Sequence, residues 1–369
     1  MIAAAADAFG AVYARRRVLV TGHTGFKGAW LTLWLSELGA EVTGYALPPE
    51  GERWFFVAAG VERRCRHHLA DVRDPQRLKE VVIDANPDAV FHLAAQPLVR
   101  RSYEDPLETM AVNVMGTAHL LEAVRARAKP CSVVIVTSDK CYENREWEHG
   151  YRETDRVGGH DVYSTSKGAA ELVVSAWRRS FFPPARLEDH GIRVATARAG
   201  NAIGGGDWAS DRIVPDCIRA LMDGRAIPVR NPTSTRPWQH VLDPLSGYLK
   251  LGARLLGNDP APYGEAWNFG PEPASRRTVR ELVEALLAQW GSGSWEDRSD
   301  PGAPHEAALL QLAIDKARAR LGWAPKWSFA EAIRHTVGWY RAQHERRPAR
   351  ELEALALQQI RAYGEAETR

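Results

Sequence analysis

The feature that most constrains this chain is the regular alternation of short apolar segments with amphipathic helical segments through its first 200 residues. Parallel strands need long crossover connections, so this alternation is typical of an α/β protein with a doubly wound parallel sheet. The predicted strands are 17–22, 41–46, 66–72, 89–95, 132–138 and 193–200, and the predicted helices include 26–39, 106–128 and 163–180.

Three glycines, Gly22, Gly25 and Gly28, separate the first predicted strand from the first predicted helix. Glycine lets a backbone turn tightly and approach a pyrophosphate closely, while the helix N-terminus stabilises its charge. This spacing in a strand–turn–helix context predicts a dinucleotide-binding Rossmann domain. Asp71 follows a later strand, where its carboxylate can bind an adenine amino group. The expected cofactor contacts here are Gly22, His23, Thr24, Gly25, Phe26, Lys27, Gly28 and Asp71.

The residue that would read the ribose is ambiguous. An enzyme that prefers NAD usually carries an acid at the end of the second strand, but Tyr45 stands near that position. No arginine follows immediately to accept a 2′-phosphate. We expect NAD, and these residues do not exclude NADP.

After about residue 200 the pattern loosens into loops rich in glycine and proline with shorter helices. We therefore predict a nucleotide-binding domain at 1–200 and a smaller C-terminal α/β substrate domain at 201–369. Some of the later chain is expected to cross back to the first domain.

Charge and cysteine content narrow the class of protein. Lys and Arg number 48 against 46 Asp and Glu, a net charge of +2 that gives no support to nucleic-acid or membrane-surface binding. No apolar run approaches the roughly 18 residues of a membrane span. At the N-terminus the apolar residues precede the basic ones, the reverse of a secretory signal, and a short extension is expected there. The four cysteines are widely spaced, which favours a reducing cytoplasm, and the histidine spacing predicts no metal site.

A polar group follows the apolar strand 132–138: Ser138, Asp139 and Lys140. Ligands of open α/β sheets bind at such strand ends. On the next predicted helix, Tyr163 and Lys167 are four residues apart and share a face. An ammonium near a phenol is expected to lower the pKa of Tyr163, which would let the tyrosinate take a proton from a sugar hydroxyl.

With the glycine turn, "FHLAA", "NVMGT" and the Tyr163/Lys167 pair, residues 17 to about 340 resemble the extended short-chain dehydrogenase/reductase family. Within it, the stretches "GHTGFKGAWL", "TSDKCYENREW" and "GGGDWASDRIVPD" resemble the CDP-glucose 4,6-dehydratases. The resemblance implies conversion of CDP-D-glucose to CDP-4-dehydro-6-deoxy-D-glucose and water, a step in the biosynthesis of deoxysugars of surface lipopolysaccharide (O-antigen). Bound NAD would oxidise C4, water would leave across C5 and C6, and hydride would return to C6.

The resemblance also implies further cofactor contacts, namely Val72, Leu93, Ala94, Ala95, Asn113, Tyr163 and Lys167. It implies catalytic roles as well. Tyr163, assisted by Lys167 and next to Ser138, would take the C4 hydroxyl proton, and Asp139 would protonate the departing hydroxyl. The related dTDP-glucose dehydratases have an Asp–Glu pair where this chain has Asp139 and Lys140. Lys140 could take the C5 proton only when neutral, or it could stay charged and stabilise the enolate while another group acts as base.

Several substrate contacts follow from the same resemblance, with arginines suited to the diphosphate. They are Gln96, Ser102, Asn201, Arg212, Ile213, Arg236 and Asn268. The helices 106–128 and 163–180 would form a four-helix interface in a homodimer or homotetramer.

Two other functions are compatible with parts of this pattern. A nucleotide-sugar 4-epimerase, or a dehydratase for another nucleotide, would also use Tyr163 and Lys167, but an epimerase needs no acid–base pair for elimination. A protein that binds NAD without catalysis would not need Tyr163 and Lys167 at all.

Overall fold

The computed structural model describes residues 9, 11–299 and 309–367. Its centre is a seven-stranded sheet in the order β11-β6-β5-β4-β1-β2-β3, with every neighbouring pair parallel. This arrangement confirms the predicted doubly wound fold. The strands are β1 (Arg17–Thr21), β2 (Glu41–Ala46), β3 (Arg66–Leu69), β4 (Ala89–His92), β5 (Cys131–Val136), β6 (Ile192–Ala199) and β11 (Ala266–Phe269).

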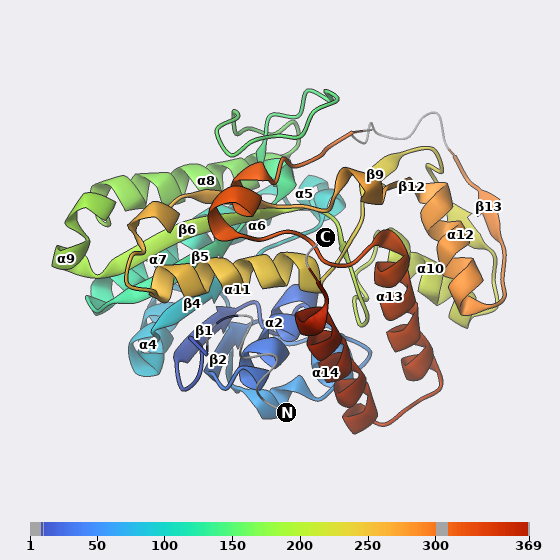
Figure 1. Cartoon of the computed structure of the whole chain (residues 1–369), viewed down its shortest axis with the longest axis horizontal. Coiled ribbons are helices and arrows are strands. Elements are labelled where there is room, and N and C mark those ends of the chain that lie inside the picture. Colours follow the sequence, from blue (N-terminus) through green and yellow to red (C-terminus); the bar gives the residue numbers. More distant parts are fainter. Residues whose placement is uncertain (1–8, 10, 300–308, 368–369) are drawn as a thin grey trace.

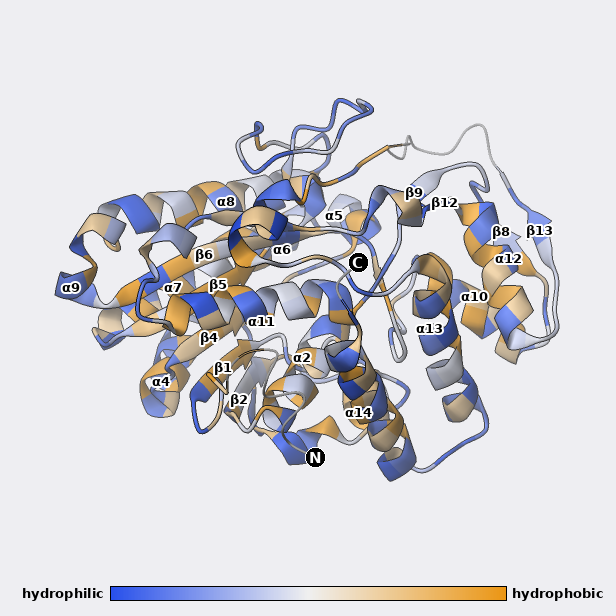
Figure 2. Cartoon of the chain, in the orientation of Figure 1, coloured by the Kyte–Doolittle hydropathy of each residue, from blue (hydrophilic) through white to orange (hydrophobic). Residues whose placement is uncertain are grey.

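Successive residues of the strands face two separate cores, because side chains alternate across a sheet. Val18 and Val20 of β1 belong to one hydrophobic cluster, whereas Leu19 between them belongs to the other. The helices α2 (Phe26–Glu37) and α11 (Leu242–Leu256) cover the first face, and α4 (Pro75–Ala85), α7 (Gly116–Arg127) and α8 (Val162–Ser180) cover the second. In Figure 2 hydrophobic colouring runs through the strands, while the helices mix hydrophobic and hydrophilic residues.

The predicted helix 106–128 is confirmed, and it contains one irregular turn. The chain forms α5 (Val99–Glu104), then α6 (Pro106–Met110), a π-helical turn η2 (Ala111–Met115) and finally α7. A π turn inserts an extra residue into the helix and often marks a functional region. Here it carries Asn113, which is almost completely buried between β4 and α8.

The chain after residue 200 contributes to both parts of the molecule. β11 is the edge strand of the main sheet next to β6, and α11 packs on that sheet, whereas α10, α12, α13 and short strand pairs form the region at the right of Figure 1. The C-terminal helix α14 returns to α2, where Tyr363 contacts Trp34 and Arg361 pairs with Glu37. The remaining helices and strands are α3 (Phe55–Ala58), α9 (Leu187–His190), β7 (Ala202–Ile203), α10 (Ile213–Met222), β8 (Ile227–Val229), β9 (Thr235–Pro237), β10 (Gln239–His240), β12 (Arg276–Thr278), α12 (Val279–Trp290), β13 (Trp295–Asp297), α13 (Phe329–His344) and α14 (Ala349–Glu365).

The expected N-terminal extension falls mainly on residues 1–8 and 10, outside the described residues. Within the described part of the chain, no helix is both long and apolar enough to span a bilayer. No group of three or more potential metal ligands occurs among those residues either.

Candidate active site at the carboxyl edge of the sheet

In the turn between β1 and α2, the glycines pack directly against neighbouring backbone atoms. Gly22 has φ +74°, and a Cβ there would lie 2.7 Å from the backbone nitrogen of Ala94. A Cβ at Gly28 would lie 2.0 Å from the carbonyl oxygen of Gly22. Gly25 precedes α2 with no side-chain cap, and the first turn of α2 contains no acid. These features fit the binding of a dinucleotide pyrophosphate at an open helix N-terminus.

Most side chains of this turn point into the protein. The ring of His23 is buried against β2, 2.4 Å from where a Cβ on Gly44 would lie, and burial lowers the pKa of His23 to about 4. The Thr24 hydroxyl donates to the carbonyl of Leu47, and Phe26 is in the core. The predicted contacts of His23 and Phe26 with a cofactor could therefore involve only their backbone.

Lys27 differs from these side chains. It is half-buried, and its charged neighbours are Arg212, Asp139 and Asp207. Burial, together with Arg212, lowers the pKa of Lys27 to about 8, although the two carboxylates act in the opposite direction. Lys27 thus belongs to the group of charged side chains around the strand ends.

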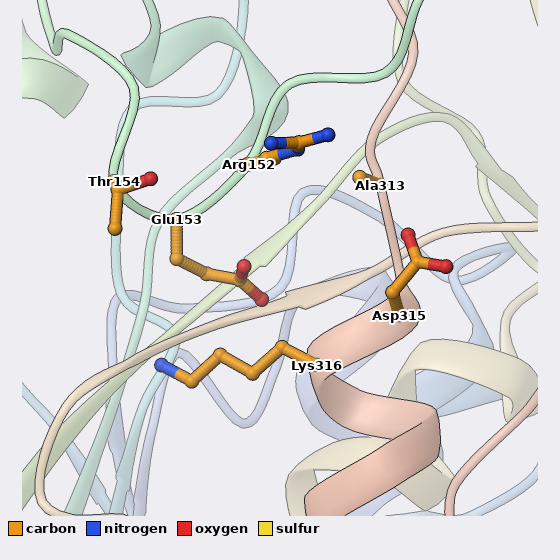
Figure 3. Close-up of a pocket in the computed structure, with 6 residues that line it drawn as sticks. All are labelled: Arg152, Glu153, Thr154, Ala313, Asp315 and Lys316. Atoms are coloured by element: carbon orange, nitrogen blue, oxygen red, sulfur yellow. The ribbon is translucent and has the colours of Figure 1, made fainter.

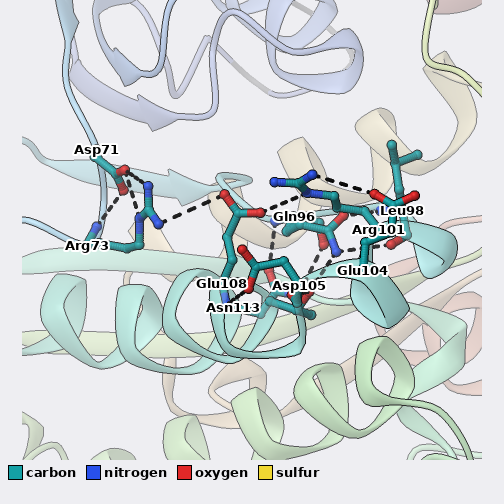
Figure 4. Close-up of polar contacts among 10 residues, drawn as sticks. Asp71, Arg73, Gln96, Leu98, Arg101, Glu104, Asp105, Glu108 and Asn113 are labelled. Atoms are coloured by element: carbon teal, nitrogen blue, oxygen red, sulfur yellow. Dashed lines mark hydrogen bonds and ion pairs between the residues drawn. The ribbon is translucent and has the colours of Figure 1, made fainter.

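Beside the glycine turn, Tyr45 lies near the end of β2, and Asp71 and Arg73 follow β3. The Tyr45 hydroxyl donates to the backbone carbonyl of Asp71 at 2.7 Å. Burial would raise the pKa of Asp71, but hydrogen bonds from the backbone and guanidinium of Arg73 lower it below its usual value. Figure 4 shows Arg73 between Asp71 and Glu108. The Asp71 carboxylate is therefore ionised and about one quarter exposed.

The loop after β4 is fixed to α8 through Asn113. Its side chain accepts from the backbone of Gln96 and donates to the Gln96 carbonyl (Figure 4). It also donates to Ser166 at 2.8 Å. The Gln96 side chain is likewise used within the protein, by Leu98 and Thr109. Asn113 and Gln96 therefore hold this loop in the ligand-free protein, and their contacts with ligands stay predictions.

Leu93, Ala94 and Ala95 directly follow β4 at the same edge. Leu93 donates its backbone N–H to the Thr21 carbonyl, and Ala94 donates to the Thr21 hydroxyl. Val72 is buried in the second core. Of this predicted group, Ala94 is thus beside the glycine turn, and Val72 could contact a cofactor only through its backbone.

The turn after β5 gathers the predicted acid–base residues. Ser138 donates to the Asp139 carboxylate at 2.9 Å and accepts from the backbone N–H of Lys140 at 3.2 Å. Asp139 is 6% exposed, and its Oδ2 atom occupies the space above Gly200, where a Cβ would approach to 2.4 Å. Gly200 therefore makes room for this carboxylate at the end of β6.

Tyr163 and Lys167 lie on the buried face of α8, as predicted, with Lys167 Nζ 6.0 Å from the Tyr163 ring centroid. The expected lowering of the tyrosine pKa is wrong for the ligand-free protein. Burial, with a contribution from Asp139, raises the pKa of Tyr163 to about 12, and hydrogen bonding with Ser138 only partly opposes this. Burial and the charge of Lys27 lower the pKa of Lys167 to about 8. No described residue forms a hydrogen bond with Lys167 Nζ, so this ammonium is available to a ligand.

Arg212 immediately precedes α10 and pairs with Asp207 at 2.8 Å. Its charge acts on both Tyr163 and Lys27, which places the guanidinium at the same site. Asp207 is buried, and the pair raises the pKa of Arg212. Ile213 is the first residue of α10, Asn201 is the second residue after β6, and Arg236 is half-buried in β9.

Two predicted substrate contacts, Asn268 and Ser102, are fully buried in the ligand-free protein. Asn268 is fully buried in β11, where its side chain accepts from Tyr142 and donates to the carbonyls of Tyr151 and Ala313. Ser102 is also fully buried, and its hydroxyl donates to the Val99 carbonyl at 2.6 Å. Both side chains are bonded within the ligand-free protein, and their contacts with a sugar stay predictions.

A cavity of about 280 Å³ lies elsewhere, between the loop after β5 and the chain that follows residue 309 (Figure 3). None of the predicted site residues lines it. Its lining consists of Arg152, Glu153, Thr154, Ala313, Asp315 and Lys316.

Sequence reasoning missed Glu171 and Arg198, which form a buried ion pair behind the Ser138–Lys140 turn at 2.7 Å. A signal was present: Glu171 is four residues after Lys167 on a helix face that is otherwise buried. Arg198 likewise follows Val194 and Thr196 on one face of a buried strand. A charge in such a pattern indicates a buried partner.

Comparisons with known proteins agree with this geometry. The family model described as GDP-mannose 4,6 dehydratase matches residues 19–259. The CDP-glucose 4,6-dehydratase of Salmonella typhimurium is 49% identical over 327 residues, 89% of this chain and 91% of the relative. The dTDP-glucose 4,6-dehydratase of Streptomyces niveus is 30% identical over 336 residues, 88% of this chain and 93% of the relative.

Among solved structures, a double mutant of the dTDP-glucose 4,6-dehydratase DesIV from Streptomyces venezuelae, with NAD bound, superimposes with a TM-score of 0.75. It is 26% identical, and the match covers 89% of this chain and 98% of that one. Fold, family model and relatives agree, and the chain belongs to the nucleotide-sugar 4,6-dehydratases of the extended short-chain dehydrogenase/reductase family.

Proposed function

We propose that this chain is a CDP-glucose 4,6-dehydratase that converts CDP-D-glucose to CDP-4-dehydro-6-deoxy-D-glucose and water. The observation that carries the proposal is the meeting of Ser138, Asp139, Tyr163 and Lys167 at the edge that also holds the glycine turn. The identity of the base rests on the 49% identical relative, whose name specifies CDP-glucose. The product is a precursor for deoxysugar synthesis.

NAD is the proposed cofactor, and when bound it would accept a hydride from the sugar and return it. The backbone of Gly22, Gly25 and Gly28 with the N-terminus of α2 would hold its diphosphate. The ionised Asp71 would bind the adenine amino group. Lys167, with no hydrogen bond among the described residues, would bind a ribose hydroxyl.

Tyr163 would remove the proton of the C4 hydroxyl while C4 is oxidised to a ketone. Because its pKa is about 12 in the ligand-free protein, Tyr163 is protonated at neutral pH and must ionise within the closed complex. The Ser138 hydroxyl and the Arg212 charge both lower the pKa of this phenol. They are therefore the groups that would stabilise the tyrosinate once substrate has displaced water.

The ketone acidifies the C5 proton, and elimination follows. Lys140 in its neutral form would take that proton as Asp139 gives its own proton to the C6 hydroxyl, which leaves as water. In the other assignment, a charged Lys140 stabilises the enolate. The two assignments predict different results for one variant. Lys140→Gln should abolish C5 proton exchange if Lys140 is the base, but only slow the exchange if Lys140 is an enolate stabiliser.

Arg212 and Arg236 would face the diphosphate, since a guanidinium offers paired donors to phosphate oxygens. Asn201 and Ile213 would line the same side. We further propose a cytoplasmic protein, in keeping with four free cysteines.

Self-association is also proposed. Helices α5–α8 carry exposed apolar side chains, namely Leu107 at 80%, Tyr103 at 65% and Leu172 at 59% exposure. Exposed apolar patches of this kind mark interaction surfaces. We propose that a second copy covers them in a homodimer, alone or within a tetramer, and light scattering of the purified protein would measure the mass.

The test is a mass-spectrometric assay of the NAD-loaded protein with CDP-, dTDP-, UDP- and GDP-glucose supplied separately. The proposal predicts loss of one water from CDP-glucose and little from the others. Loss of water from another nucleotide alone would overturn the substrate. An epimer without loss of water would overturn the reaction.

A further inference from the structure

The face of the sheet that α8 covers is apolar in its middle and polar at its carboxyl edge. In β5 the residues on this face are Val133, Ile135 and, just beyond the strand, Thr137. In β6 they are Val194, Thr196 and Arg198. The apolar stripe thus ends in three polar side chains that need buried partners.

One carboxylate supplies those partners. Glu171 of α8 accepts from the Thr137 hydroxyl at 2.5 Å through Oε1. Its Oε2 atom accepts from the Thr196 hydroxyl at 2.8 Å and from Arg198 at 2.7 Å. Glu171 and Arg198 are each only 5% exposed. Hydrogen bonds to an ionised, buried carboxylate are shorter and stronger than neutral ones.

Arg198 extends this network to the other side of the Ser138–Lys140 turn. Its second nitrogen donates to the Tyr142 hydroxyl at 2.7 Å and to the Glu153 carbonyl at 3.2 Å. Thr137 immediately precedes the turn and Tyr142 follows it closely. Both ends of the turn are therefore tied, through the same ion pair, to the helix that carries Tyr163 and Lys167.

We propose that Glu171 is a positioning residue: through Thr137 and Arg198 it holds the Asp139–Lys140 turn in register with Tyr163 and Lys167. The network consists of side chains other than those proposed to take part in the chemistry. It fixes the position of Asp139 and Lys140, which would carry out the elimination. That position is set relative to Tyr163 and Lys167, which would carry out the oxidation. This inference rests on the proposed function for its catalytic consequence, although its structural content does not.

The chain offers a matched pair of variants. Thr137→Val and Thr196→Val each replace a buried hydroxyl that donates to Glu171 by a methyl group of similar size, but only Thr137 adjoins the turn. The first readout is amide hydrogen exchange in residues 138–142 of the NAD-loaded protein. We expect at least tenfold faster exchange there in Thr137→Val and less than a threefold change in Thr196→Val. Equal rates in the two variants would overturn the proposal.

The second readout is the absorbance of reduced cofactor at 340 nm after one equivalent of CDP-glucose is added. If elimination is slowed more than oxidation, reduced cofactor should accumulate about fivefold above the wild-type level in Thr137→Val, and Thr137→Ser should restore the wild-type trace. Loss of all steps together, with no accumulation, would indicate a structural role only and overturn the proposal. Glu171→Gln tests the same prediction if Thr137→Val does not fold.

The two proposals fail separately. If the wild-type protein removes no water from CDP-glucose, the proposed function is wrong, and the hydrogen-exchange comparison still tests Glu171. If the wild type is active but the turn exchanges alike in both variants, only the positioning role is wrong.

Discussion

The turn after β1 and the turn after β5 lie at the same edge of the sheet. The first depends on its backbone atoms and the second on its side chains. The β1 turn works through its backbone, because a Cβ at Gly28 would lie 2.0 Å from the Gly22 carbonyl oxygen. The β5 turn works through side chains, with Ser138 bonded to Asp139 and the Glu171–Arg198 pair behind it. The comparison teaches that steric change should disable the first turn, whereas loss of a single polar atom should disable the second.

The largest expected effect comes from removing one oxygen beside the β5 turn. Tyr163→Phe should lower kcat by about 10³-fold, ~4 kcal/mol, because the group that takes the C4 proton is gone. Steady-state water loss from CDP-glucose measures this. Tyr13→Phe is the matched control, since it removes a buried hydroxyl bonded to the Leu249 carbonyl far from the site. It should cost about 1 kcal/mol of stability and leave kcat unchanged. Similar kcat losses in both variants would remove Tyr163 from the chemistry.

The support behind the β5 turn should fail next. Arg198→Gln leaves the Glu171 carboxylate buried without its cation, and we expect the free energy of unfolding to fall by about 3 kcal/mol. Urea denaturation measures the change. Arg186→Gln breaks an exposed pair with Asp189 and should change the free energy of unfolding by less than about 0.5 kcal/mol. A loss for Arg198→Gln as small as that of the control would mean that the buried pair is not needed for the fold.

The β1 turn should lose affinity for NAD when a larger side chain replaces one of its glycines. Gly28→Ala should weaken NAD binding by about 100-fold, ~2.8 kcal/mol, because the methyl group displaces the Gly22 carbonyl. Gly338→Ala makes the same change in helix α13, where nothing lies within 4 Å of the new methyl group. It should stabilise the protein by about 0.5–1 kcal/mol and leave NAD binding unchanged. Calorimetric titration with NAD separates the two, and equal affinities would contradict a backbone-built cradle.

The smallest effect concerns pH. The folded-state pKa of Lys167 is about 8, below the value of 10.5 that the residue has when unfolded. Between these values the unfolded chain binds more protons than the folded one, so this lysine makes stability rise with pH. From pH 8 to 10 its contribution should grow by ~2 kcal/mol. In the ligand-free protein, Lys167→Met should therefore show a flatter rise of the free energy of unfolding over this range, measured by urea denaturation at each pH. An identical rise would contradict the lowered pKa.

Much of the fold was predictable from local patterns. Strand–helix alternation placed six of the strands in the sheet within a few residues of their observed positions. The seventh, β11, lies about 70 residues after β6 and joins it through long-range pairing that no local pattern encodes. The π turn at Asn113 was also missed, because its cause is a set of contacts with Gln96 and Ser166 from other elements.

The site was predictable where residue type alone implies chemistry. Tyr163, Lys167, Asp139 and Arg212 do come together. The full burial of Asn268 and Ser102 could not be predicted, because burial depends on the whole fold. The direction of the Tyr163 pKa shift was wrong for the same reason, since desolvation outweighs the favourable hydrogen bond and charge nearby.

The most direct test of the division between the two turns is Asp139→Asn, observed at 340 nm in the NAD-loaded protein mixed with CDP-glucose. The amide keeps the shape of the side chain but cannot give a proton to the leaving hydroxyl. C4 oxidation should therefore proceed while elimination stops, and the absorbance of reduced cofactor should rise and persist. If no reduced cofactor forms, Asp139 is needed for oxidation itself, and the assignment of elimination to the β5 turn is wrong.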